Sequence, residues 1–260
     1  MCSLFRFNAL SYGVAAVIAL IGVIVAARSL SLVTVICAFF YATIVISLQT
    51  VSITAMSVGA MSSTSICVMY GMIIPAVAGP LFWSEKIGAL QIVGMLLMLL
   101  SLWLINRKAP SKESKKTNKW IILAVVAFLL SGMAGVMEKI HQSTEARAEK
   151  LQFVFAACTF MLVFSLVAIL ITRKKGKEGR SVFRLSLPVL SGLVVGLYST
   201  VNLILAGKLD SMIYYPIANG GAMLLTVLVS AMFFKEKFDR LKIVGVIVGL
   251  VGILCLSIPA

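Results

Sequence analysis

Charged side chains are scarce in this 260-residue chain, and acidic ones most of all. Only 12% of the residues are charged, whereas soluble domains average about 25%. Nine acidic residues and a single histidine leave few groups that could serve as general acids, general bases or metal ligands. The sequence also has no GxxxxGK[ST] loop, which argues against ATP hydrolysis. We therefore expect no enzymatic activity, no cofactor and no metal.

Cysteine is also sparse, and the spacing of the cysteines matches no disulfide or metal-binding motif. The number is odd, no CxxC pair occurs, and four of the five lie within apolar runs. We interpret them as small buried hydrophobic residues and not as disulfides or zinc ligands. The five are Cys2, Cys37, Cys67, Cys158 and Cys255.

Long apolar runs, in contrast, fill most of the chain, which is 61% hydrophobic. A helix needs roughly 20 apolar residues to cross a ~30 Å hydrocarbon core. Unbroken runs of this kind are unlike the alternating strands of a membrane barrel. We predict an all-α integral membrane protein with about nine transmembrane helices. The predicted spans are 9–27, 31–54, 60–83, 88–106, 119–138, 151–172, 185–207, 212–234 and 241–259.

One stretch occurs twice at an offset of 151 residues. Residues 82–94 read FWSEKIGALQIVG and residues 233–245 read FFKEKFDRLKIVG, and each copy joins two apolar spans. We expect the paired Glu85 and Glu236 to cap helices or to pair with the neighbouring lysines. The offset divides the chain into a first repeat (1–107, four spans), a basic linker (108–118) and a second repeat (119–260, five spans). Repeats with an odd number of spans have inverted topology, as in many secondary carriers.

Basic residues account for the net charge of +14. Sixteen of them lie in three short links, 107–119, 173–184 and 235–242, which fall on one side of the membrane if the spans alternate. This is the positive-inside pattern, so we expect the N-terminus inside and the lipid bilayer as the partner of these charges. Nucleic acid is not an expected partner.

The duplicated Glu-Lys links, each leading into a Leu-x-Ile-Val-Gly helix, resemble the EamA-type members of the drug/metabolite transporter (DMT) superfamily. The segment 131–139 (SGMAGVMEK) is similar to the first helix of a repeat in that family. The resemblance implies ten helices in two inverted five-helix repeats around a central substrate cavity. It also implies transport of amino acids, other metabolites, drugs or sugars. Nothing in the first half matches 119–138, so we expect either that this bundle lacks the family's first helix or that the true start of the protein lies upstream of Met1.

Polar side chains inside apolar spans are the candidate substrate-binding residues, because such groups are costly in lipid and usually face a cavity or another helix. Tyr198 and Asn202 are four residues apart and share a helix face, and Tyr215 and Asn219 repeat this arrangement. The alternative is hydrogen bonding between helices that only supports packing. Further candidates in the first half are Tyr41, Gln49 and Tyr70.

Glu138 is the one acidic residue that can fall within a span. Inside the membrane it could carry a proton during exchange. The alternative, which we favour from the sequence, is a glutamate at the helix end, on the membrane surface, paired with Lys139 or His141.

Glycine and proline residues predict two further properties of the helices, close packing and a bend. Gly245, Gly249 and Gly252 allow close helix approach, either within the chain or in a homodimer. Gly192 and Gly196 repeat the pattern, and there we favour packing within the chain. The third span contains Pro75, Gly79 and Pro80, which predict a bend.

Together these features predict a multi-pass transporter of the cell membrane, driven by a gradient and moving a small metabolite or drug by alternating access. An exporter is one form of this prediction. A neutral or cationic solute fits better than an anionic one. The alternative is a non-transporting or incomplete membrane protein that assembles with a partner subunit.

Overall fold

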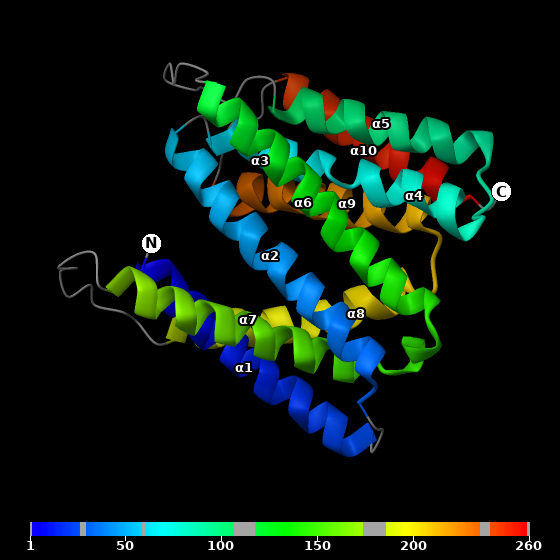
Figure 1. Cartoon of the computed structure of the whole chain (residues 1–260). Helices are drawn as coiled ribbons and strands as arrows, with labels where there is room; N and C mark the ends of the chain where they lie inside the picture. The colour runs from blue at the N-terminus through cyan, green and yellow to red at the C-terminus, as the bar shows by residue number, and fades with distance from the viewer. Residues whose placement is uncertain are drawn as a thin grey trace. The chain divides into compact units, whose positions relative to one another are not determined.

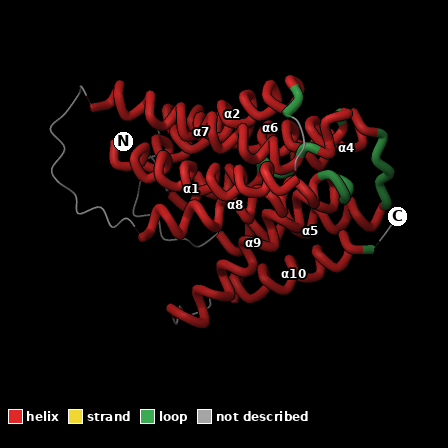
Figure 2. Tube along the Cα trace, turned by 90° about the horizontal axis from the view of Figure 1, so that it is seen from below, coloured by secondary structure: helices red, strands yellow, loops and turns green. Residues whose placement is uncertain are grey.

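The computed structural model describes residues 2–26, 30–58, 61–106, 118–173, 186–234 and 240–258. Within these ranges the chain is helical, and no strand occurs (Figures 1 and 2). The elements are α1 (Cys2–Ala26), α2 (Leu32–Val58), α3 (Met61–Tyr70), α4 (Ile73–Trp83), α5 (Ala89–Asn106), α6 (Asn118–Ser143), η1 (Glu145–Ala148, a 3₁₀ turn), α7 (Lys150–Arg173), α8 (Ser186–Ala206), α9 (Ser211–Phe234) and α10 (Arg240–Ser257).

These helices confirm the predicted spans, and their surfaces confirm a membrane protein. Five described helices, α1, α2, α6, α7 and α8, are long and apolar enough to cross a bilayer. Large apolar side chains lie exposed along them, among them Ile24 at 69% and Leu170 at 65%. Such faces are unfavourable in water and suit contact with lipid tails. The basic links that carry the predicted orientation lie mostly outside the described residues.

The predicted third span is interrupted, as its prolines indicate, but the break precedes them. Helix α3 ends at Tyr70 and α4 begins at Ile73, so Pro75 falls in the first turn of α4, where a missing backbone N–H is tolerated. At the break, Gly71 packs so closely on α6 that a Cβ there would lie 2.6 Å from Cβ of Ser131. Only glycine fits this approach.

The chain forms two compact units, each assembled from both sequence halves. Unit 1 contains Met1–Ser47 and Met137–Gly207, and unit 2 contains Leu48–Val136 and Lys208–Ala260. In unit 1, α1 packs against α7 and α8 over a core of small residues in which Ala15, Ala38 and Ala42 are fully buried. In unit 2, α5 packs against α10 and α4 packs against α9.

Helices related by the 151-residue offset pack against each other inside the units. Helix α10 begins and ends 151 residues after α5, and the two lie side by side in unit 2 (Figure 1). The pairs α4 with α9 and α1 with α7 follow the same offset. The repeat boundaries proposed from the sequence stay a prediction, since the compact units cut across them.

The faces of α8 and α10 that carry the paired glycines pack against other helices of the same chain. A Cβ at Gly245 would lie 2.7 Å from Ile105, and one at Gly249 would lie 2.6 Å from Oγ of Ser101. Ser101 in turn donates a 2.7 Å hydrogen bond to the carbonyl of Gly245. Gly192 likewise packs on α1, against Val14. The homodimer stays a prediction, and it needs a surface other than this face of α10.

Glu85 caps a helix, as the sequence indicates. It lies between α4 and α5, and its carboxylate accepts hydrogen bonds from the backbone N–H and the hydroxyl of Ser211, at 2.7 and 3.1 Å. Ser211 is the first residue of α9, where backbone N–H groups lack partners within the helix. The corresponding Glu236 lies outside the described residues.

Candidate functional site

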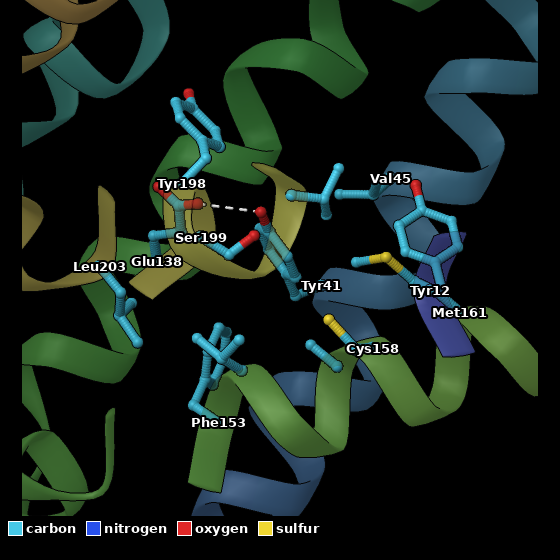
Figure 3. Close-up of a pocket in the computed structure, with 13 residues that line it drawn as sticks. Tyr12, Tyr41, Val45, Glu138, Phe153, Cys158, Met161, Tyr198, Ser199 and Leu203 are labelled. Carbon is cyan, nitrogen blue, oxygen red and sulfur yellow. Dashed lines mark hydrogen bonds between the residues drawn. The ribbon is translucent and has the colours of Figure 1, made fainter. Parts of the chain in front are cut away.

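Unit 1 contains a partly open cavity of about 180 Å³ between side chains of α1, α2, α6, α7 and α8. Its wall is mainly apolar and aromatic, with one carboxyl group (Figure 3). The lining residues are Tyr12, Tyr41, Val45, Glu138, Phe153, Val154, Ala157, Cys158, Met161, Val195, Tyr198, Ser199 and Leu203.

Helical spacing brings these side chains to the cavity. Tyr41 and Val45 are four residues apart on α2, and Val154, Cys158 and Met161 follow at intervals of four and three on α7. Residues with this spacing share one helix face. Each helix therefore turns one stripe toward the cavity while its other side contributes to the core or to the surface of the unit.

Glu138 is the chemical centre of the cavity. Its Oε1 accepts a 2.9 Å hydrogen bond from the hydroxyl of Tyr41 and a 2.7 Å hydrogen bond from the side-chain amide of Asn202 (Figure 3 draws the first). Within the described residues, both bonds end on Oε1. Glu138 is 7% exposed, so its carboxylate is held by two neutral donors in an interior where an unpaired charge is costly.

This geometry corrects the interpretation that the sequence favours, a glutamate at the helix end. The predicted span ends at residue 138, but α6 continues to Ser143. At 1.5 Å per residue, the five extra residues place Glu138 about 7.5 Å before the end of the helix. The hydrogen bonds to Glu138 come from Tyr41 and Asn202, and His141 instead bonds to other residues.

A second polar cluster lies beside the cavity, where α6 turns into α7. Oε2 of Glu149 accepts hydrogen bonds from Thr34 Oγ1 at 2.6 Å, Ser31 Oγ at 2.8 Å and Ser31 N at 3.0 Å. His141 bonds to Thr34 through Nε2 and to Gln142 through Nδ1. This cluster ties the start of α2 to the link between α6 and α7.

Hydrogen bonds set the pKa of Glu149 in this cluster, and the His141 ring packs against the cavity wall. Burial raises the pKa of Glu149, but the hydrogen bonds from Thr34 and Ser31 outweigh that effect and hold the pKa below its usual value of 4.5. The His141 ring packs on Phe153, with 4.4 Å between ring centroids, and Phe153 lines the cavity. The cluster therefore supports one wall of the cavity from behind.

The predicted binding residues divide between the two units. Tyr41, Glu138, Tyr198 and Asn202 meet in unit 1, where three of them line the cavity and Asn202 reaches it through Glu138.

The other four belong to unit 2. Tyr215 donates a 2.6 Å hydrogen bond to the carbonyl of Gly135, and Tyr70 donates a 3.1 Å hydrogen bond to the carbonyl of Leu99. Asn219 donates to a carbonyl of its own helix, and Gln49 is half-buried. The two tyrosine contacts match the packing alternative, and the binding role of these four stays a prediction.

Several residues that line the cavity are not among the binding residues predicted from the sequence. Tyr12 could have been found, because a hydroxyl inside an apolar span is itself a signal. Phe153, Cys158 and Met161 give no such signal, since apolar residues in an apolar span look alike whether they face lipid, core or cavity.

The fold and the cavity define an all-α, multi-pass membrane protein with a buried polar centre. The sequence model of the EamA-like transporter family matches residues 118–258, more than half of the chain, and the chain therefore belongs to that family, within the DMT superfamily. One crystal structure of a protein matches with a TM-score of 0.76 over 98% of this chain and 89% of its own length. At 11% identity this likeness shows a shared fold. No curated protein matches the chain in sequence.

Proposed function

We propose that the protein is a secondary transporter of a small solute and that the unit 1 cavity is its substrate site. One observation carries the proposal: the carboxylate of Glu138 lies in a cavity within membrane-spanning helices, positioned by Tyr41 and Asn202. A buried carboxylate within such helices is costly, and groups of this kind usually mark substrate or ion pathways. Membership of a transporter family supports the same conclusion.

In the proposed site, each polar group has a distinct role. Tyr41 and Asn202 fix Oε1 of Glu138, which leaves Oε2 for the solute or for a proton. Exchange follows if the solute and a proton compete for this carboxylate. The aromatic rings of the wall exclude water and supply contact area.

The transport cycle needs a gradient, because the sequence has no ATP-hydrolysing motif. Alternating access then comes from rearrangement of the helices around the cavity, as in carriers built from repeats. We propose the cell membrane as the location of the protein.

The test begins with a thermal-shift screen of the purified full-length chain against amino acids, sugars, nucleosides and organic cations, at two pH values. A ligand that binds only the folded state raises the melting temperature. Counterflow of each hit is then measured in proteoliposomes, for the wild type and for Glu138→Gln. The expected result is saturable counterflow that Glu138→Gln abolishes. Glu145→Gln, an exposed glutamate in η1, is the matched control.

Two outcomes contradict the proposal. One is counterflow that Glu138→Gln leaves unchanged, which places the pathway elsewhere. The other is a well-folded sample that neither binds nor moves any solute. If a second membrane protein copurifies with such a sample, the alternative of an assembly with a partner subunit is favoured instead.

A further inference from the structure

We propose that the unit 1 cavity selects a small organic cation, with a substituted ammonium head about the size of choline. This inference rests on the proposed function, because it names the substrate class of the same site.

The charge of the cavity wall supplies the first argument. Glu138 is the charged side chain among the lining residues, and they include no lysine, arginine or histidine. His141 packs behind Phe153 and bonds to Thr34 and Gln142. A bound anion would face the carboxylate with no cation on the wall to compensate, whereas a cation would neutralise it. In a poorly solvated site that difference is large.

The hydrogen bonds of Glu138 supply the second argument. Its two donors, Tyr41 and Asn202, both bond to Oε1. Within the described residues no donor bonds to Oε2, so this oxygen is the acceptor left for a ligand. Neutral donors hold the carboxylate in place without cancelling its charge, which an arginine or lysine partner would do.

The rings of the wall supply the third argument. Tyr12, Tyr41 and Phe153 are buried or half-buried, come from three helices and line the same cavity as the carboxylate, whereas the fourth lining ring, Tyr198, is 62% exposed (Figure 3). Aromatic faces attract cations, and cages of aromatic residues are the usual way in which proteins recognise quaternary ammonium groups. Rings from separate helices can surround a rounded head group that offers no hydrogen-bond donor.

The size of the cavity decides which cations fit. Its volume is about 180 Å³. An apolar cavity of about 150 Å³ holds one benzene molecule, so this site accommodates a ligand slightly larger than benzene. A choline-sized amine fits that volume.

The test uses three ligands of nearly the same shape and different charge. Choline is the cation, 3,3-dimethylbutan-1-ol is its neutral isostere, and 3,3-dimethylbutanoate is an anion of similar size. Binding of each to the purified full-length chain is measured by calorimetry. We expect choline to bind about tenfold or more tightly than the neutral isostere, and the anion not to bind. Because this comparison uses the wild type alone, it does not depend on the folding of a variant.

Variants then assign the preference to Glu138. Glu138→Gln should remove the preference for choline over the neutral isostere, while Glu145→Gln, which removes the same charge from an exposed position, should retain it. The inference is overturned if the neutral or anionic ligand binds as tightly as choline, or if none of the three binds.

Binding and transport separate the two proposals. If choline binds with the expected preference but shows no counterflow, the substrate class stands and the proposed transport function fails. If choline does not bind, and counterflow of another solute depends on Glu138, the transport function stands and the cation inference fails.

Discussion

Asn202 on α8 donates a 2.7 Å hydrogen bond to Glu138 on α6, and these residues lie 64 positions apart in the chain. The contact joins two helices of unit 1 through the one buried carboxylate of the cavity wall. An amide is well suited to this position, because it offers a donor to the carboxylate without introducing a charge.

Replacing this donor should therefore affect both binding and stability. Asn202→Leu leaves Glu138 with the Tyr41 hydrogen bond, and we expect loss of solute binding and a decrease in stability of about 1–3 kcal/mol. Tyr41→Phe removes only the other donor and should weaken binding as well. Titration calorimetry and thermal unfolding of the monodisperse variants check both effects. Wild-type affinity in both variants would contradict this role for the hydrogen bonds to Glu138.

The Glu149 cluster should stabilise the protein in a pH-dependent way. Because its pKa is lower in the folded protein than in the unfolded chain, ionised Glu149 contributes stability that is fully present above its usual pKa of 4.5. That contribution is lost as the pH falls through the lower pKa of the folded state. Glu149→Gln should cost about 1 kcal/mol at neutral pH, since the site is only partly buried.

Melting temperatures at several pH values check this prediction. The difference between the wild type and Glu149→Gln should shrink below pH 4.5. Glu145→Gln should behave as the wild type, because the Glu145 side chain is exposed. A constant difference at every pH would show that Glu149 does not act through its charge.

The glycine face of α10 should be essential for packing within the monomer. A Cβ at Gly249 would lie 2.6 Å from Oγ of Ser101 and 2.9 Å from Cδ2 of Leu224. Gly249→Leu should therefore destabilise the protein by about 1–3 kcal/mol or more through overpacking. The matched pair is Gly249→Ala and Gly221→Ala, and only the first should destabilise the protein, since a Cβ at Gly221 would meet only Ile253 Cδ1, at 4.0 Å.

Thermal unfolding and light scattering distinguish the two interpretations of this face. We expect Gly249→Leu to lower the melting temperature at an unchanged oligomeric state. If the variant instead turns a dimer into a stable monomer, the glycine face serves association between chains.

The sequence predicts the helices well, because long apolar runs directly reflect the thickness of a bilayer. It also selects Tyr41, Tyr198 and Asn202, since polar groups in such runs need partners; the structure brings them to or beside the cavity, and their binding role stays a prediction. The sequence does not show whether an apolar residue of a span faces lipid, the protein core or a cavity. Phe153 gives no sign that it lines a cavity.

Glu138 shows a second limit. Whether Glu138 lies inside the helix or at its end depends on where α6 ends. The apolar run that defines the predicted span stops at residue 138, whereas α6 continues to Ser143. The polar residues after Glu138 continue the helix because His141 and Gln142 find partners within unit 1. Those contacts depend on the tertiary fold, so the sequence pattern alone does not reveal them.

The most direct test of this cavity as the substrate site is ligand protection of a thiol introduced by Ser199→Cys, because Ser199 lines the cavity and is partly exposed. Cys158 lines the same cavity but is only 2% exposed, and buried thiols react poorly. Alkylation of the introduced thiol is followed by mass spectrometry, with and without the solute that gives the largest thermal shift. Cys67 in unit 2 is the internal reference. We expect the solute to slow alkylation at position 199 several-fold and to leave Cys67 unchanged. A solute that raises the melting temperature without slowing the reaction at position 199 would contradict the assignment of this cavity as the substrate site.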